Sequence, residues 1–114
     1  MFMVILFCLA GCSGETLKNE KHNDTGTSME MSYDNFSGER SKIISLKANT
    51  TIKVEIVTNN GEIALSIVDK AGDMAYTGNG IKTGSFSVTV DKDTDYIIKV
   101  VAKSHEGSYK ITWE

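Results

Sequence analysis

Apolar and polar residues alternate with a period of two along most of the chain after residue 28. Because successive side chains of a β-strand point to opposite faces, this period is typical of strands with one buried and one solvated face. Both faces are apolar between residues 97 and 101, which predicts a central strand. Weaker alternation occurs at 29–36 and 42–46. The clearest alternating stretches lie at 52–56, 63–67, 86–90, 96–101 and 109–113.

Turn-forming residues separate these stretches at the spacing of β-hairpins. Glycine and asparagine tolerate the positive φ angles that tight hairpins need. The sequence therefore predicts an all-β fold, an antiparallel, jelly-roll-like β-sandwich of seven to eight short strands over residues 29–114. The predicted turns are Asn59-Asn60-Gly61, Asp69-Lys70-Ala71-Gly72, Gly78-Asn79-Gly80 and His105-Glu106-Gly107.

The chain begins with an uninterrupted apolar run, Met1 to Ala10, that ends in Leu9-Ala10-Gly11-Cys12. A helix needs roughly 20 residues to span a bilayer, so a run of this length is typical of a signal peptide. The closing motif resembles the lipobox of bacterial lipoprotein precursors. That resemblance implies that the thiol of Cys12 receives a diacylglyceryl group and that cleavage just before it removes residues 1–11. It also implies a palmitate-bearing protein in the cell membrane, lipid-anchored and facing outside the cytoplasm.

The apolar run departs from the usual signal peptide, which opens with a basic region. No Lys or Arg precedes Lys18, and this predicts a start upstream of Met1. The alternative interpretation of the run is a buried first β-strand, but the abrupt change to polar residues after Cys12 favours cleavage. Ser13 is compatible with a Gram-positive membrane and with a Gram-negative outer membrane.

Residues 13–28, SGETLKNEKHNDTGTS, contain almost no apolar side chains. Such a segment cannot bury enough apolar surface to order itself. As a flexible coil it would have an end-to-end distance of roughly 20–24 Å. The sequence therefore predicts a lipidated cysteine and flexible tether over residues 12–28, followed by the sandwich.

Both cysteines of the chain, Cys8 and Cys12, lie in the N-terminal segment. The mature domain after Cys12 therefore lacks cysteine, which excludes an internal disulfide, a thiolate zinc site and a thiol nucleophile. The 15 acidic and 12 basic residues are interspersed and give a formal net charge of −3. This pattern lacks the basic footprint of a nucleic-acid-binding protein and leaves the acyl chains, rather than charge, to hold the protein on a membrane.

A second resemblance covers residues 51–113, with the segments TIKVEIV, EIALSIVDKAG and DYIIKVVAKSHEGSYKITW. These segments resemble the pre-peptidase C-terminal type of small β-sandwich, a module of many secreted bacterial proteins. The stretch YDNFSGERSKIISLKANTTIKV is similar to the start of small uncharacterised Gram-positive lipoproteins in which one such domain is the whole mature protein. Neither resemblance implies an enzymatic activity.

Three acidic residues at alternate positions, Asp91, Asp93 and Asp95, are candidate oxygen ligands for calcium. They do not begin an EF-hand loop, because Tyr96 stands where that loop needs glycine and Ala102 where it needs glutamate. The alternative interpretation is a solvated acidic turn between two strands.

The histidines and aromatic residues give no catalytic pattern. His22 lies in the predicted tether and His105 in a predicted polar turn, and no GxSxG motif provides a nucleophilic serine. Alternation predicts that Tyr109 and Trp113 pack in the core. Tyr76 lies in the turn-rich stretch AYTGNG and is expected to be the most exposed aromatic residue, where recognition often concentrates.

These observations together predict a non-catalytic binding or structural module of the cell envelope, without a cofactor or a metal site. Its expected partners are the membrane, through the acyl chains on Cys12, and an envelope protein or glycan. The alternatives are a carbohydrate-binding module of the cell wall, a small metal-dependent hydrolase, and a domain that self-associates through a sheet edge.

Overall fold

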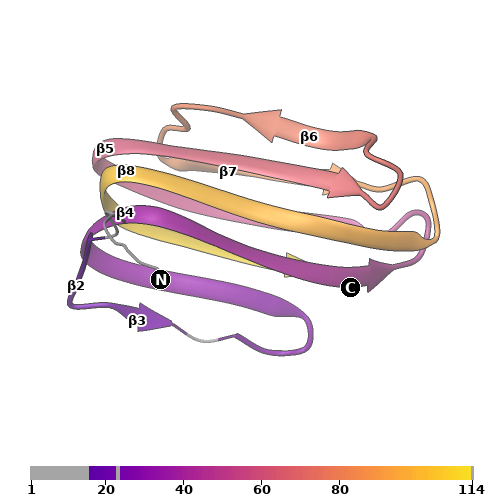
Figure 1. The fold of residues 1–114 in the computed structure, drawn as a ribbon, viewed down its shortest axis with the longest axis horizontal. Coiled ribbons are helices and arrows are strands. Elements are labelled where there is room, and N and C mark those ends of the chain that lie inside the picture. Colours follow the sequence, from indigo (N-terminus) through magenta and orange to yellow (C-terminus); the bar gives the residue numbers. More distant parts are fainter. Residues whose placement is uncertain (1–15, 23, 114) are drawn as a thin grey trace, which may run out of the picture.

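The computed structural model describes residues 16–22 and 24–113, so the predicted signal peptide and Cys12 lie outside the described residues. The described chain is all-β and antiparallel, as the alternation predicted. Among these residues, no helix has the length and hydrophobicity needed to cross a bilayer. Figure 1 shows its strands, which are β2 (Thr16–Lys18), β3 (Lys21–His22), β4 (Ser28–Leu46), β5 (Thr51–Asp69), β6 (Met74–Gly78), β7 (Gly84–Thr89) and β8 (Thr94–Trp113).

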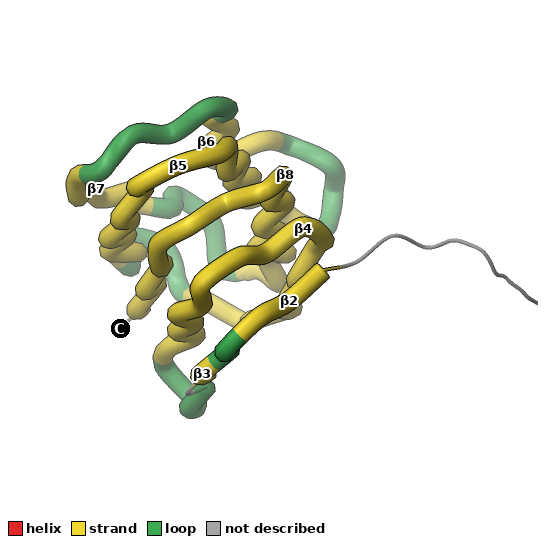
Figure 2. Tube along the Cα trace, turned by 90° about the vertical axis from the view of Figure 1, so that its left-hand side faces the viewer, coloured by secondary structure: helices red, strands yellow, loops and turns green. Residues whose placement is uncertain are grey.

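The sandwich is built from three long strands that each fold back on themselves. Strands β4, β5 and β8 have 19, 19 and 20 residues, and each makes a U-shaped bend near its middle (Figure 1). The pairing registers shift at these bends, and the two halves of each strand lie in different layers (Figure 2). We call layer 1 the layer formed by residues 28–33, 51–58, 107–113 and β7, and layer 2 the layer formed by residues 38–46, 62–69, 94–103 and β6.

The central position of β8 agrees with its apolar sequence. In both layers β8 pairs with β4 on one side and with β5 on the other. The sequence analysis placed hairpin turns at residues 59–61 and 105–107, and the structure corrects this, because both segments are bends inside continuous strands. Gly61 has a φ of +79°, and a Cβ there would lie 2.0 Å from the backbone oxygen of Ser104. Glycine at this position therefore permits both the backbone conformation and the close approach of β5 and β8.

The N-terminal part of the described chain differs from the expected flexible tether. Residues of β2 and β3 pair with β4 between Met31 and Ser37, and Leu17 packs against the core. Backbone hydrogen bonds hold this polar segment, and such bonds do not require apolar side chains. Hydrophobicity alone therefore placed the start of the ordered chain too late.

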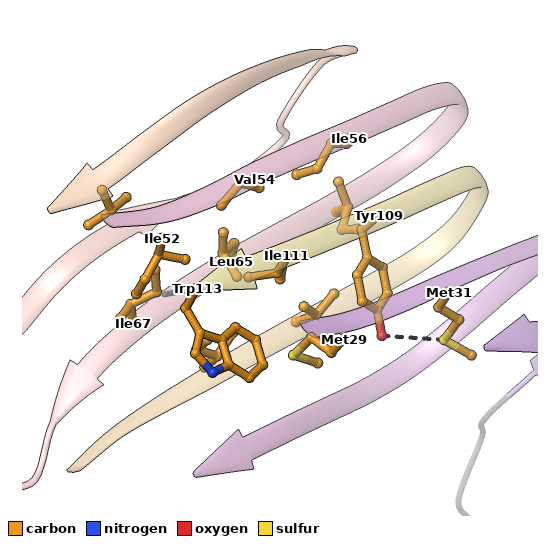
Figure 3. Close-up of a cluster of buried hydrophobic side chains, with 14 of the residues drawn as sticks. Met29, Met31, Ile52, Val54, Ile56, Leu65, Ile67, Tyr109, Ile111 and Trp113 are labelled. Atoms are coloured by element: carbon orange, nitrogen blue, oxygen red, sulfur yellow. Dashed lines mark hydrogen bonds between the residues drawn. The ribbon is translucent and has the colours of Figure 1, made fainter. Parts of the chain in front are cut away.

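The core lies between the two layers and consists of the inward-facing residues of every long strand (Figure 3). Tyr109 and Trp113 are 3% and 4% exposed, which confirms their predicted place in the core. Figure 3 also shows the Tyr109 hydroxyl directed at the sulfur of Met31, at 3.4 Å. The interior is therefore filled by apolar and aromatic side chains.

Candidate functional site

The outer face of layer 2 carries a row of aliphatic side chains across four strands. The strand register places Ile43 opposite Ile97, Ile97 opposite Val68, and Val68 opposite Met74. Ile43, Met74 and Ile97 are 68%, 58% and 40% exposed. We call these four residues the aliphatic row. Apolar residues that adjoin one another on an exposed face, rather than being scattered singly, form a candidate contact surface.

A shallow hollow lies beside the aliphatic row on the same face. It has a volume of about 330 Å³. Its lining includes the small residues Ala64, Ser66 and Gly78, which leave the surface hollow at this point. Val101 adds an aliphatic side chain that is 42% exposed. Lys99 also lines this hollow, and its ammonium group pairs with the carboxylate of Glu39 at 3.3 Å.

The outer face of layer 1 is polar by contrast. The register places Glu30 opposite Lys110 and Lys110 opposite Glu55, so opposite charges alternate across three strands. Serine and threonine side chains of β7 are exposed next to them. This face offers hydrogen-bonding groups, whereas the outer face of layer 2 combines charged and polar groups with the aliphatic row.

A buried polar network lies inside the bends of the three long strands. The side chain of His105, on β8, is fully buried. Its Nδ1 lies 2.5 Å from the hydroxyl of Tyr33 on β4, and its Nε2 lies 2.8 Å from the hydroxyl of Thr58 on β5. The hydroxyl of Thr58 donates to the carbonyl oxygen of Ile81 at 3.0 Å.

These contacts determine which ring nitrogen of His105 carries the proton. Because the single hydroxyl proton of Thr58 goes to a carbonyl, Nε2 of His105 must donate to Thr58 and Nδ1 must accept from Tyr33. Burial lowers the pKa of His105 and raises the pKa of Tyr33, so both groups are neutral at pH 7. The predicted polar turn at His105 is therefore wrong, because the imidazole lies in the interior and joins three strands.

The candidate calcium ligands take separate structural roles. Asp93 accepts the backbone N–H of Ala48 at 2.6 Å, and Asp95 accepts the hydroxyl of Ser45 at 2.5 Å. Within residues 16–22 and 24–113, no group of three His, Cys, Asp or Glu side chains is arranged to hold a metal ion. Asp91 is exposed. The acidic turn thus binds the neighbouring 45–48 segment.

A second acidic cluster, at the β5–β6 turn, was not found from the sequence. Asp69 is 5% exposed and accepts the backbone N–H groups of Ala71 and Asp73, each at 2.9 Å. Lys92 approaches Asp69 at 3.2 Å and Asp73 at 2.7 Å. The backbone N–H of Asp73, followed by Lys92, holds the pKa of Asp69 below its ordinary value. The signal was the spacing Asp69-x-x-Gly72-Asp73, in which an aspartate caps its own turn.

The aromatic residues of the described chain are buried or half-buried. Tyr76, which the sequence analysis expected to be exposed, is half-buried and packs on Phe86 with ring centroids 4.8 Å apart. This pair closes the sandwich between β6 and β7 because each ring comes from a different layer. The described surface thus presents no fully exposed ring for stacking on a sugar.

His22, the other histidine, is exposed, and its Nδ1 contacts the carboxylate of Glu20. It lines a surface hollow of about 380 Å³ beside the two halves of β4. His105 lines none of the five principal hollows of the described residues, whose volumes run from about 260 to 390 Å³. None of these five hollows therefore brings His105 together with carboxylates.

No protein-family model and no curated protein matches the sequence. Among solved structures, the chain is similar to PliG of Aeromonas hydrophila, a periplasmic inhibitor of g-type lysozyme. The identity is 15%, the match covers 77% of this chain and 87% of PliG, and the TM-score is 0.53.

The chain is also similar to two structures with bound sugars. TmCBM61 in complex with beta-1,4-galactotriose matches with 16% identity over 82% of this chain and 64% of that one, at a TM-score of 0.46. The carbohydrate-binding module CBM6cm-2 of Cellvibrio mixtus lichenase 5A, in complex with cellotriose, matches with 17% identity over 89% and 86%, at a TM-score of 0.42. At these identities the likeness shows the β-sandwich fold alone.

Proposed function

We propose that this chain is a lipid-anchored, non-catalytic binding module of a bacterial cell envelope. The proposed anchor is the thiol of Cys12, and the motif Leu9-Ala10-Gly11-Cys12 is the observation that supports a location in the envelope. The filled interior supports a non-catalytic role. Its buried imidazole, His105, is held by Tyr33 and Thr58 and is withdrawn from solvent, so the chemistry that remains to the domain is that of its surfaces.

The partner of this module is an envelope protein or a glycan. The polar outer face of layer 1 supports both, because its serine and threonine hydroxyls and its alternating charges can hydrogen-bond to either. The aromatic rings of the described residues are buried or half-buried, and this favours the protein partner, since sugar recognition ordinarily uses an exposed ring.

The anchor is tested by metabolic labelling with palmitate and by membrane fractionation. The unchanged chain is expected to be labelled and to sediment with membranes, and Cys12→Ser is expected to lose the label. Cys8→Ser is the matched control, because that cysteine lies in the segment that processing removes, and it should retain the label. Persistent labelling of Cys12→Ser would refute the proposed anchor.

The binding role is tested with the lipoprotein solubilised in detergent and carrying a C-terminal affinity tag. It is incubated separately with purified cell-wall sacculi and with a membrane-protein extract after chemical cross-linking. Lys53→Glu, on the outer face of layer 1, is expected to weaken retention of the true partner, whereas Lys99→Glu, on the outer face of layer 2, should not. Retention by sacculi alone would establish the glycan alternative, and retention by neither would refute a binding role.

A further inference from the structure

We propose that the outer face of layer 2 lies against the membrane surface, with the aliphatic row in contact with lipid. This inference rests on the proposed anchor at Cys12 and adds which face of the domain that anchor presents to the bilayer.

The first support is the short distance between the anchor and the ordered domain. β2 begins at Thr16, only four residues after Cys12, and four residues extend no further than roughly 14 Å. The domain measures 41 × 32 × 24 Å, so an anchor of this length is shorter than every dimension of the domain. The domain is therefore held close to the lipid headgroups and must direct one of its surfaces at them.

The second support is the place where the chain enters the domain. Thr16 pairs with Ser37, directly before Gly38, where β4 enters layer 2. The described chain thus starts beside the bend of β4, at the edge where layer 2 begins, and Ile43 lies five residues further along the same strand.

The third support is the contrast between the two outer faces. Four of the five exposed large hydrophobic residues in the described chain lie on the outer face of layer 2, and the remaining one, Val57, lies in layer 1 near its bend. Both outer faces carry charged side chains, so the difference between them is the aliphatic residues of layer 2, and such side chains enter the boundary between headgroups and acyl chains readily. The four residues on layer 2 are Ile43, Met74, Ile97 and Val101.

The charges around the aliphatic row nearly cancel. Lys99 pairs with Glu39, and Lys103 lies opposite Glu62 on the neighbouring strand. Asp95 adds one negative charge beside Ile97 and accepts the hydroxyl of Ser45. A contact of this composition depends on burial of hydrocarbon and responds little to anionic lipid. In this orientation the polar outer face of layer 1 points away from the bilayer, toward an envelope partner.

The test uses the processed lipoprotein in lipid vesicles and one introduced cysteine at a time. Processing removes Cys8 and the lipid blocks the thiol of Cys12, so a cysteine placed at Ile43 or at Ser85 is the only one that reacts with a fluorescent probe. Ser85 is exposed on β7 of layer 1 and serves as the matched position. Vesicles of phosphatidylcholine carry a nitroxide quencher on the acyl chain, and mass spectrometry first verifies the lipid on Cys12.

The probe at Ile43→Cys is expected to be quenched at least about threefold more strongly than the probe at Ser85→Cys. Adding phosphatidylglycerol should change the difference less than about twofold, because the local charges cancel. In the Ile43→Cys protein, the additional changes Ile97→Ser and Met74→Ser should reduce quenching at position 43. Val57→Ser is the control, because it also replaces an exposed aliphatic side chain but lies in layer 1, and it should leave quenching at position 43 unchanged.

The outcomes separate the inference from its premise. Equal quenching at the two positions in protein of verified lipidation would overturn the inference and leave the proposed anchor intact. A probe at position 43 that is shielded from aqueous iodide but not quenched by the lipid nitroxide would also overturn it, because the face would then be covered by protein, such as a second copy of this chain. An unmodified Cys12 would refute the proposed anchor itself.

Discussion

Replacing Tyr33 by phenylalanine removes one hydroxyl from the network at the bends and leaves the ring in place. The ring packs on Phe36 with centroids 5.2 Å apart, and phenylalanine keeps this contact. The lost hydroxyl is the donor to Nδ1 of His105. In the variant this nitrogen stays buried without a donor, because the opposite nitrogen is already engaged with Thr58.

The expected cost follows from the burial of His105. A buried acceptor without a partner costs about 1–3 kcal/mol, and full burial places this site toward the middle of that range or above it. We therefore expect Tyr33→Phe to lower the free energy of unfolding by about 2 kcal/mol. For a domain of this size, this corresponds to a fall in Tm of roughly 8–16 °C.

The measurement is urea unfolding at pH 7.5 of the chain from Ser13 on, followed by tryptophan fluorescence from Trp113. Tyr109→Phe is the matched control, since Tyr109 is equally buried but donates to the sulfur of Met31, a weak acceptor, at 3.4 Å. Burial raises the pKa of Tyr109 to about 12, so this tyrosine is also neutral in the assay. The control should cost less than about 1 kcal/mol. Equal costs for the two variants, or a cost below about 0.5 kcal/mol for Tyr33→Phe, would refute the assigned network.

Three further predictions concern the buried groups and the bends. Because burial lowers the pKa of His105, the unfolded chain binds a proton below about pH 6.5 that the folded chain does not. The free energy of unfolding should therefore fall with decreasing pH in that range, by at most about 1.4 kcal/mol per pH unit. His105→Asn should remove this pH dependence, and an unchanged slope would contradict a buried, neutral His105. Asp69→Asn should lower Tm more than Asp73→Asn, because Asp69 is 5% exposed and Asp73 is 71% exposed, and thermal melts that rank them oppositely would exclude a structural role for Asp69. Gly61→Ala should cost more than about 1 kcal/mol, because the new Cβ meets backbone at 2.0 Å, whereas Gly84→Ala, which meets nothing within 4 Å, should be nearly neutral in the same melts.

The sequence was sufficient for the strands because their alternation has a direct physical cause. One buried and one solvated face impose the period of two, and the apolar character of residues 97–101 identified β8 as central. The bends were not predictable in the same way. A glycine after two polar residues, as in Asn59-Asn60-Gly61, allows positive φ in a hairpin turn and in a bend alike, and packing between layers decides between them.

The surfaces were predictable only in part. A polar triplet such as Ser104-His105-Glu106 gives no sign that its middle residue is buried, because Tyr33 and Thr58, which hydrogen-bond to its imidazole, come from distant strands. The aliphatic row likewise depends on register, since it joins Ile43, Ile97 and Val68 from three separate strands. Alternation shows that a residue faces outward and does not show what lies beside it.

Each of the three long bent strands continues from one layer into the other, so the two layers are joined through the same strands. A sandwich whose strands each belong to one layer can lose one sheet while the other persists, but here β4, β5 and β8 supply most of both layers. Unfolding one layer therefore frees one half of each long strand, and the other half of the same strand belongs to the remaining layer. The domain is therefore expected to lack a half-unfolded state with an open sheet edge, the state from which sandwich proteins aggregate and are cut by proteases.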